Sequence, residues 1–385
     1  MAINTIDGIV AAISAGQTYK YCYNKQTTNA TAFTAGRWYN LATLPGSPAA
    51  DTFPGTTMIA VSCVGGNAAV MTNASGNWTV AVDGSNHVTV DTITSHNFSP
   101  GQILTMNASW STNTFMQGIT PTITSCPTTH TFLFTKTQAT QIATTEAGTA
   151  ANMTPTNMTG CMPTGGVVNA AGYTKYLTGI EVSTAIGTGV PSWLMLVDML
   201  MYYPAIPLNT ASAQTLLGAT TLPRYTSGNG VMMFLELATA AGVAQNLTMS
   251  YYNSAGSPVV HTLPGTVALT AATIPAHLIH SGVAVNNFGP FLPLAAGDTG
   301  VTTATYASGF TLAGTGTGTA NLVLCKPLAQ IPLTTLGVAS GRDLVFNMPS
   351  MPIVYDGACL SFLVFAGAAT AQYTNFQATL DFVWG

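Results

Sequence analysis

The sequence predicts an all-β protein made of jelly-roll-like β-sandwich domains, and three observations lead to this prediction. Short runs of Thr, Val, Ile and aromatic residues recur along the chain, and Gly, Pro, Asn and Ser bound them. One segment alone shows a helical period. Hydrophobic residues make up 47% of the 385 positions, which is enough to build substantial cores.

The N-terminal segment carries the helical period. Asp7 suits the first turn of a helix, and Gly16 suits a helix end. We expect a short amphipathic helix there, packed on its own domain or reaching a neighbouring chain. Its apolar positions follow the i, i+3, i+4, i+7 spacing of one helix face: Ile6, Ile9, Val10 and Ile13.

Two pairs of segments predict β-hairpins. Trp78–Val82 and His87–Val90 flank an Asp-Gly pair, a combination that favours a tight turn. Leu247–Tyr252 and Val259–Leu263 flank a polar turn segment in the same way.

Further strands are expected in the more apolar parts of the chain. Two of these strands are expected at Tyr176–Val182 and Ser192–Tyr203. Ala320–Cys325 and Cys359–Phe365 are continuous apolar runs, which suit strands covered on both faces inside a sandwich or at a subunit contact.

Composition and turn density divide the chain into three regions. Residues 1–65 together with 173–206 are expected to form an N-terminal β domain that includes the short helix. Residues 66–172 are expected to form a small inserted β module, and residues 207–385 a C-terminal β-sandwich domain.

The chain is unusually poor in charge. Asp, Glu, Lys and Arg account for 20 residues, 5% of the chain, whereas an ordinary soluble domain carries roughly 25%. The eight cations are scattered singly, so direct nucleic-acid binding is not expected. A surface of uncharged polar and small residues suits permanent contact with other protein chains.

The sequence also bears on membrane insertion, secretion and disulfide formation. The longest apolar stretch contains Pro191, Asp198 and Pro204, so no membrane span is expected. The first residues lack the basic region of a secretory signal, so we expect synthesis in the cytoplasm. The six cysteines show no Cys-x-x-Cys pair and are expected to be free, mostly buried thiols.

The sequence contains no pattern typical of catalysis, a metal or a cofactor. His277 and His280 would lie on opposite faces of a strand, with no carboxylate or cysteine nearby. Asp198, in an apolar strand, is expected to form a structural ion pair with Arg37 or Arg224. No Gly-x-Ser-x-Gly elbow or cluster of acids is present, so we expect a protein that is not an enzyme.

One part of the inserted region resembles a known module. A small β module widespread in structural proteins of tailed phages has a strand, a His-Gly-Phe turn and two further strands. Asn97 stands where that family usually has Gly, and Asn tolerates a positive φ. The segments that carry the resemblance are Val88–Val90, Ser95–Leu104, Gly118–Ser125 and Thr131–Phe134.

Several further segments are similar to a family of tailed-bacteriophage virion proteins described as structural or capsid-associated. The resemblance implies a component of the virion, with the inserted module absent from shorter family members. The segments that carry it are Gly36–Leu41, Leu44–Pro48, Leu196–Pro204, Leu222–Tyr225, Asn286–Gly300, Pro349–Leu360 and Leu380–Gly385.

The function expected from these observations is that of a decoration or cement protein on the capsid exterior. It would stabilise the shell by repeated contacts with the major capsid protein and with copies of itself, as a homotrimer. A receptor- or glycan-binding protein of the tail or capsid surface is the alternative, and the major capsid subunit is a weaker one.

The candidate residues are therefore anchors of an interface, although each of them would also serve to close its own domain. Stacking on glycans is assigned to Trp78 and Trp110. The interface candidates are Ile6, Ile9, Val10, Ile13, Trp38, Tyr39, Phe288, Pro290 and Phe291.

Overall fold

The computed structural model arranges the described residues in four β-sheets with one short N-terminal helix, which confirms the prediction of an all-β sandwich fold. The helix, α1, spans Ile6–Ser14. Two 3-10 turns, η1 and η2, span Thr114–Met116 and Asn169–Ala171. The structure describes residues 3, 5–27, 35–44, 46–47, 56–60, 71–94, 96, 98, 102–128, 130–138, 140–162, 164–165, 168–184, 192–216, 221–238, 246–263, 278–279, 289–304, 309–335, 337–346, 351–367 and 375–385.

The sheet next to α1, here called the outer sheet, has five strands in the order β22-β13-β24-β1-β3. Its neighbouring strands are antiparallel, and its middle strand β24 comes from the C-terminal end of the sequence. The strands are β22 (Ser340–Asp343), β13 (Lys175–Thr184), β24 (Asn375–Trp384), β1 (Thr18–Thr27) and β3 (Gly46–Ser47).

The second sheet, here called the central sheet, has ten strands and is built around the long pair β14 and β21. β23 pairs with both β14 and β2, and β8 pairs with β12. The strands are β18 (Leu278–Ile279), β15 (Met232–Leu237), β21 (Thr319–Leu333), β14 (Ser192–Pro207), β4 (Thr56–Ala60), β12 (Asn152–Cys161), β5 (Met71–Thr72), β23 (Cys359–Ala366), β2 (Arg37–Asn40) and β8 (Gln102–Met106).

Two smaller sheets complete the fold. The small sheet contains β17 (Pro258–Thr262), β16 (Leu247–Asn253), β19 (Val301–Thr303) and β20 (Phe310–Leu312). The module sheet lies within the inserted region and has the order β11-β6-β7-β10-β9. Its strands are β11 (Ile142–Glu146), β6 (Trp78–Val82), β7 (His87–Asp91), β10 (Thr131–Thr135) and β9 (Ile123–Ser125).

Both hairpins expected from the sequence are present. β6 pairs with β7 and β16 pairs with β17, each in antiparallel register. The first turn is longer than a two-residue Asp-Gly turn, because Asn86 adopts a φ of 64° and its amide donates to the Asp83 carbonyl. Asparagine tolerates this left-handed conformation better than most residues.

The apolar strands β14 and β21 are covered on both faces. Their side chains enter one core shared with the outer sheet and a second core shared with the small sheet. In β14, Met199 lies in the first core, whereas Leu200 and Met201 lie in the second. The register shifts between Met199 and Met201, which explains how one strand serves two cores without strict alternation.

The domain boundary expected between residues 206 and 207 does not coincide with a break between sheets. β24 lies between β13 and β1, and β23 pairs with β14 and β2, so the C-terminal part of the chain supplies strands inside sheets begun by the N-terminal part. Local composition does not reveal such pairing, because the partners are far apart in the sequence.

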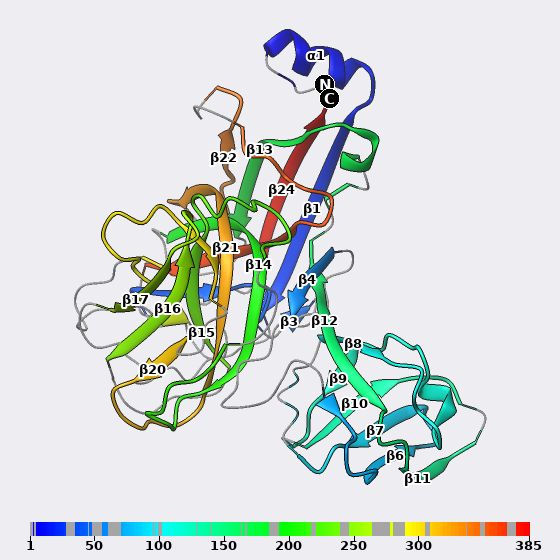
Figure 1. Cartoon of the computed structure of the whole chain (residues 1–385). Coiled ribbons are helices and arrows are strands. Elements are labelled where there is room, and N and C mark those ends of the chain that lie inside the picture. The colour runs from blue at the N-terminus through cyan, green and yellow to red at the C-terminus, as the bar shows by residue number, and fades with distance from the viewer. Residues whose placement is uncertain are drawn as a thin grey trace.

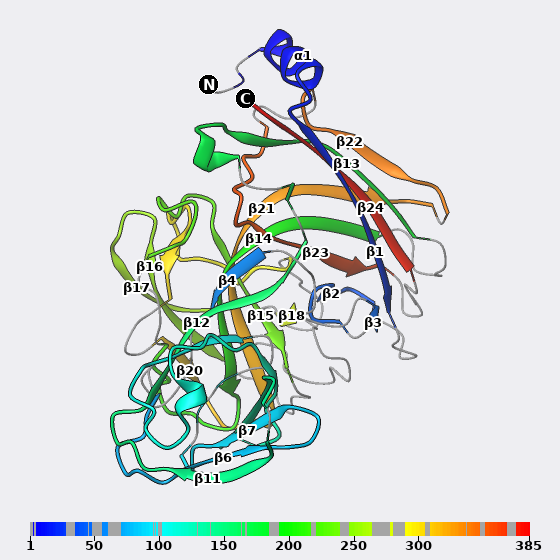
Figure 2. The same ribbon diagram turned by 90° about the vertical axis from the view of Figure 1, so that its right-hand side faces the viewer.

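The inserted region contains a core of its own, whose residues run from Met71 to Met153. Figure 1 shows this module at one end of the molecule and α1 at the other. Figure 2 shows the outer sheet stacked on the central strands β21, β14 and β23. The helix and the module are therefore separate features on opposite ends of a shared sandwich.

Candidate interface at the helical end

Helix α1 forms as the sequence predicts, and it leaves an apolar face uncovered. The hydroxyl of Thr5 caps the first turn by accepting from the Gly8 amide at 3.1 Å, and Gly16 follows the helix with a φ of 71°. Ile9 is only 8% exposed, because it packs towards the outer sheet. The other three apolar residues of the predicted face remain open to solvent: Ile6 at 54%, Val10 at 55% and Ile13 at 52% exposure.

Other exposed apolar side chains lie at the same end of the outer sheet. Trp384 in β24 donates its amide to the Gln17 carbonyl, just after α1. The amide of Thr174, next to Tyr173, donates to the Gly385 carbonyl. Ile353 forms an isolated bridge with Tyr176 of β13, and Phe346 follows Val345, which lies near α1. We call the exposed apolar residues of α1 and of these neighbouring segments the helical-end surface: Ile6, Val10, Ile13, Tyr173, Phe346 and Ile353.

Six of the ten large hydrophobic side chains that are exposed in the described residues belong to the helical-end surface. The large hydrophobic residues exposed elsewhere are single and lie on different elements: Ile93, Trp193, Val260 and Val338. Scattered exposed apolar residues are ordinary, whereas a gathering of them marks an interaction surface.

A groove of about 440 Å³ lies between α1 and the outer sheet. Ile9 and Ile13 line it from the helix side, and Val345 lines it from the segment after β22. Gly179 and Gly341 also line it, and their lack of side chains leaves the sheet surface open there.

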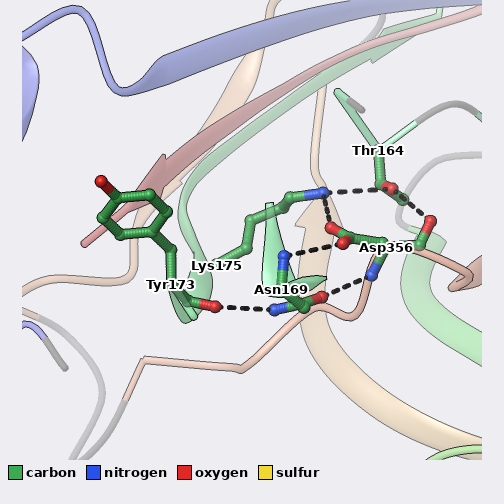
Figure 3. Close-up of polar contacts among 5 residues, drawn as sticks. All are labelled: Thr164, Asn169, Tyr173, Lys175 and Asp356. Atoms are coloured by element: carbon green, nitrogen blue, oxygen red, sulfur yellow. Dashed lines mark hydrogen bonds and ion pairs between the residues drawn. The ribbon is translucent and has the colours of Figure 1, made fainter. Parts of the chain in front are cut away.

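A polar clamp stands beside the helical-end surface and consists of Thr164, Asn169, Lys175 and Asp356 (Figure 3). The Lys175 Nζ atom lies 2.9 Å from Oδ1 of Asp356. The Asn169 amide donates to Oδ2 of Asp356 at 2.7 Å, and the Asp356 amide donates to Oδ1 of Asn169 at 2.8 Å. The Asn169 side chain also donates to the Tyr173 carbonyl at 3.0 Å. The clamp thus fixes two loops that carry exposed apolar residues.

The electrostatics of the clamp are those of a structural ion pair. Burial raises the pKa of Asp356, but hydrogen bonds from the Val168 amide, Lys175 and the Asn169 amide outweigh burial and hold this pKa below its usual value. The charged carboxylate accepts these bonds, so its role is to position the loop before β23.

Trp38 and Tyr39 are not surface anchors. Their side chains are 6% and 1% exposed and belong to the core between the outer and central sheets. The Trp38 ring lies 5.4 Å from that of Phe365, in the neighbouring strand β23. They close their own domain because β2 is paired within the central sheet.

The expectation that Phe288, Pro290 and Phe291 anchor an interface is also corrected in part. Pro290 is buried, and Phe291 is half-buried against the core between the outer and central sheets. The next residue, Leu292, donates its amide to the Met233 carbonyl at 2.8 Å. Phe288, like His277 and His280, lies outside the described residues.

Trp78 and Trp110 cannot offer stacking faces to a glycan, because their side chains are only 2% and 0% exposed. Their rings lie 5.7 Å apart inside the module core. The sequence contains a pattern that predicts the burial of Trp78. Trp78, Val80 and Val82 alternate with a two-residue period, so they share one strand face and a common core.

The ion pair expected at Asp198 is confirmed, with Arg224 as the partner. The Arg224 guanidinium donates to both carboxylate oxygens, at 2.9 and 2.7 Å, and both side chains are buried. The Cys359 amide adds a third hydrogen bond at 2.8 Å. A bidentate pair of this kind satisfies a buried charge and fixes local geometry.

Two other buried carboxyl groups were not singled out from the sequence. Glu146 accepts hydrogen bonds from the backbone amides of Ser111, Thr112, Asn113 and Gly148. Glu236 accepts bonds from side chains only: Asn40, Thr43, Tyr202 and Asn321. No local sequence pattern predicts either site, because the donors come from distant segments.

The thiols differ from the expectation in two respects. Cys22, Cys126 and Cys325 are free, but Cys22 is exposed rather than buried. Cys359 is disulfide-bonded.

The described part of the chain shows no group of three or more His, Cys, Asp or Glu side chains that could hold a metal ion. Among the same residues, no helix is long and apolar enough to cross a membrane.

Comparison with known proteins adds little to this geometry. No protein family and no curated protein matches the sequence. Among solved structures, the chain is similar to a chain in the structure of infectious bursal disease virus Gt strain, with 9% identity and a TM-score of 0.10 over 95% of this chain and 81% of that chain. A TM-score this low shows no shared fold.

Proposed function

We propose that this chain is a non-enzymatic virion structural protein of a tailed bacteriophage, which acts as a decoration or cement protein on the outside of the capsid. The observation that carries the proposal is the helical-end surface on a chain with only 5% charged residues. The segments that resemble capsid-associated phage proteins supply the assignment to a virion. The proposed partners are the major capsid protein and further copies of this chain, as a homotrimer.

The proposed mechanism is the repeated burial of exposed apolar side chains. Covering the open halves of Ile6, Val10 and Ile13 would contribute about 1 kcal/mol each before the cost of association is subtracted. Many copies on one shell act together, so weak single contacts add up to firm attachment. The added contacts would oppose expansion of the shell by the packaged DNA.

The alternatives receive less support. Glycan binding was assigned to Trp78 and Trp110, which are buried. A major capsid subunit of the usual tailed-phage type would contain a long helix, and α1, with nine residues, is the one α-helix in the described part of the chain.

The proposal is tested with phage heads that lack this protein. DNA release on heating is followed with a DNA-binding dye, for complete heads, depleted heads and depleted heads to which the purified chain is returned. We expect depleted heads to release DNA at a lower temperature and the returned chain to restore the original value. Equal release temperatures for complete and depleted heads would refute the stabilising role.

A matched pair of variants tests whether the helical end makes the contact. Val10→Asp places a charge in the helical-end surface, where Val10 is 55% exposed, and Val260→Asp places the same charge on β17, where Val260 is 64% exposed. We expect the first variant to lose at least tenfold in affinity for depleted heads and the second to bind normally. Equal binding by both variants would locate the contact elsewhere.

A further inference from the structure

The outer sheet carries a row of charged side chains beside the groove under α1. Gly179 in β13 is opposite Asp343 in β22 and also opposite Asp381 in β24, and Asp381 is opposite Lys20 in β1. Residues in one such row share a face of the sheet. The glycine in the middle lets the Asp381 side chain lie close over the sheet, because an added Cβ there would lie only 3.0 Å from Asp381 Oδ2.

The next row of this face adds a third carboxylate. Glu181, two residues after Gly179, is opposite Gly341 in β22 and Thr379 in β24. Its side chain is exposed and, like those of Asp343 and Asp381, lines the groove. Three of the chain's 12 acidic residues therefore line this groove.

The nearby cations do not balance these three carboxylates. Lys20 pairs with Asp381 at 2.8 Å. Arg342 also lines the groove, and its guanidinium donates to the Gln330 carbonyl of β21 at 3.1 Å. Three carboxylates (Glu181, Asp343 and Asp381) against two cations (Lys20 and Arg342) leave one excess negative charge here.

The same groove is apolar on its helix side. Ile9, Ile13 and Val345 line it opposite the carboxylates, and the space is about 440 Å³. Lysine and arginine side chains match such a site, because their methylene stems pack on apolar surface while their heads meet the carboxylates.

We propose that this groove receives a lysine or arginine side chain from an extended segment of the shell protein, with apolar residues on either side of it that cover Ile6, Val10 and Ile13. This inference rests on the proposed function, since it names the chemistry of the partner at the same surface. Charge complementarity between the excess negative charge and a basic side chain selects this occupant.

A second copy of this chain is a weaker match for the groove, because six of its eight Lys and Arg side chains are already buried or bonded. Lys25, Lys175 and Arg224 are buried, and Lys20, Lys326 and Arg342 are held by hydrogen bonds or ion pairs. A basic residue of another protein is the better match.

Charge reversal at Glu181 tests the occupant. Glu181→Lys should weaken binding to depleted heads at least tenfold, and Glu181→Gln should weaken it about threefold. Asp83→Lys is the matched control, because it makes the same change of net charge at an exposed position in the module (54% side-chain exposure) and should bind normally. Binding of Glu181→Lys at the wild-type level would overturn the inference.

The exposed free thiol of Cys22 identifies the partner segment directly. Cys22 is opposite Thr379, the residue that also faces Glu181, so a label on it reaches the groove. The chain is labelled with a benzophenone maleimide, bound to depleted heads and irradiated, and the cross-linked peptides are identified by mass spectrometry. Cys22→Ser, treated in the same way, controls for labelling elsewhere.

The expected cross-link joins Cys22 to a shell-protein segment with a lysine or arginine between apolar residues. Cross-links to acidic segments, or to another copy of this chain, would overturn the inference and leave the proposed function intact if the chain still stabilises the heads. Failure of the unlabelled wild-type chain to bind depleted heads would instead refute the proposed function.

Discussion

The inserted module and the central sheet each bury a glutamate completely, yet they shift the pKa of its carboxyl group in opposite directions. Glu146 in the module and Glu236 in the central sheet are both 0% exposed. Burial raises the pKa of Glu146, but hydrogen bonds from backbone amides outweigh it and lower the pKa to about 2. Burial also raises the pKa of Glu236, and its side-chain donors offset this rise only in part.

The difference comes from the kind of donor. Backbone amides can only donate, so the four that meet Glu146 require an ionised acceptor. The hydroxyl of Thr43 can either donate to Glu236 or accept from it, and its own proton has a second acceptor in the Asn40 carbonyl at 3.4 Å. The backbone amides therefore favour the ionised form of Glu146, whereas the side-chain donors of Glu236 do not offset its burial.

The strongest test of this comparison adds a third buried carboxyl, Asp198, which is held by a cation. Arg224→Ala leaves Asp198 without its charged partner, and we expect a loss of about 3–5 kcal/mol in the free energy of unfolding. Urea unfolding at pH 7 measures it. A loss below 1 kcal/mol would mean that the Cys359 amide alone satisfies the carboxylate.

Glu146→Gln should have the next largest effect. A pKa lowered from 4.5 to about 2 corresponds to about 3 kcal/mol of stability that is present above pH 4.5 and lost as the pH falls towards 2. The variant should be less stable by about this amount at pH 7 and should lack the acid-dependent loss.

The module can be followed separately in this experiment. Trp78 and Trp110 lie in its core, so fluorine NMR of 5-fluorotryptophan-labelled protein reports on the module. If the wild-type module signals were unchanged between pH 5 and pH 2, the assignment of Glu146 as an ion-holding site would be wrong.

Glu236→Gln should change the stability of the fold in the opposite direction. A carboxyl whose pKa is raised in the folded state favours folding at low pH, and that contribution is lost as the pH rises from about 4.5 through the folded value. The neutral variant should be more stable than the wild type at pH 8, on the order of 1 kcal/mol, with no difference at pH 3. Thermal unfolding across this pH range checks the sign, and a destabilised variant at pH 8 would contradict it.

The smallest effect is expected for an exposed carboxyl. Asp381 pairs with Lys20 at 2.8 Å, and the two side chains are 41% and 64% exposed. Lys20→Ala should change the free energy of unfolding by less than about 0.5 kcal/mol, because solvent screens the pair. A larger loss in urea unfolding would show that the outer face of this sheet is less solvated than its exposure indicates.

Much of the secondary structure was predictable because its determinants are local. The period of Ile6 to Ile13 predicts α1, and the alternating residues of Trp78–Val82 predict a strand of the first hairpin. The isolated Asp198 in an apolar strand predicts an ion pair, since an unpaired charge there would be too costly.

The candidate site was predictable only in part. The sequence identified Ile6, Val10 and Ile13 as interface candidates, and the structure leaves them exposed. It gave no sign that Asp343, Glu181 and Asp381 lie beside the helix, because the register of three strands brings them together.

The sequence by itself determined the β class, the hairpins and the helix, because each depends on residues within a few positions of one another. Tertiary structure alone decided that β24 lies between β1 and β13, that Trp38 and Trp110 are buried, and which donors meet each carboxyl group. These outcomes depend on pairing between distant segments, and the free energy of such pairing comes from the assembled core rather than from any local pattern.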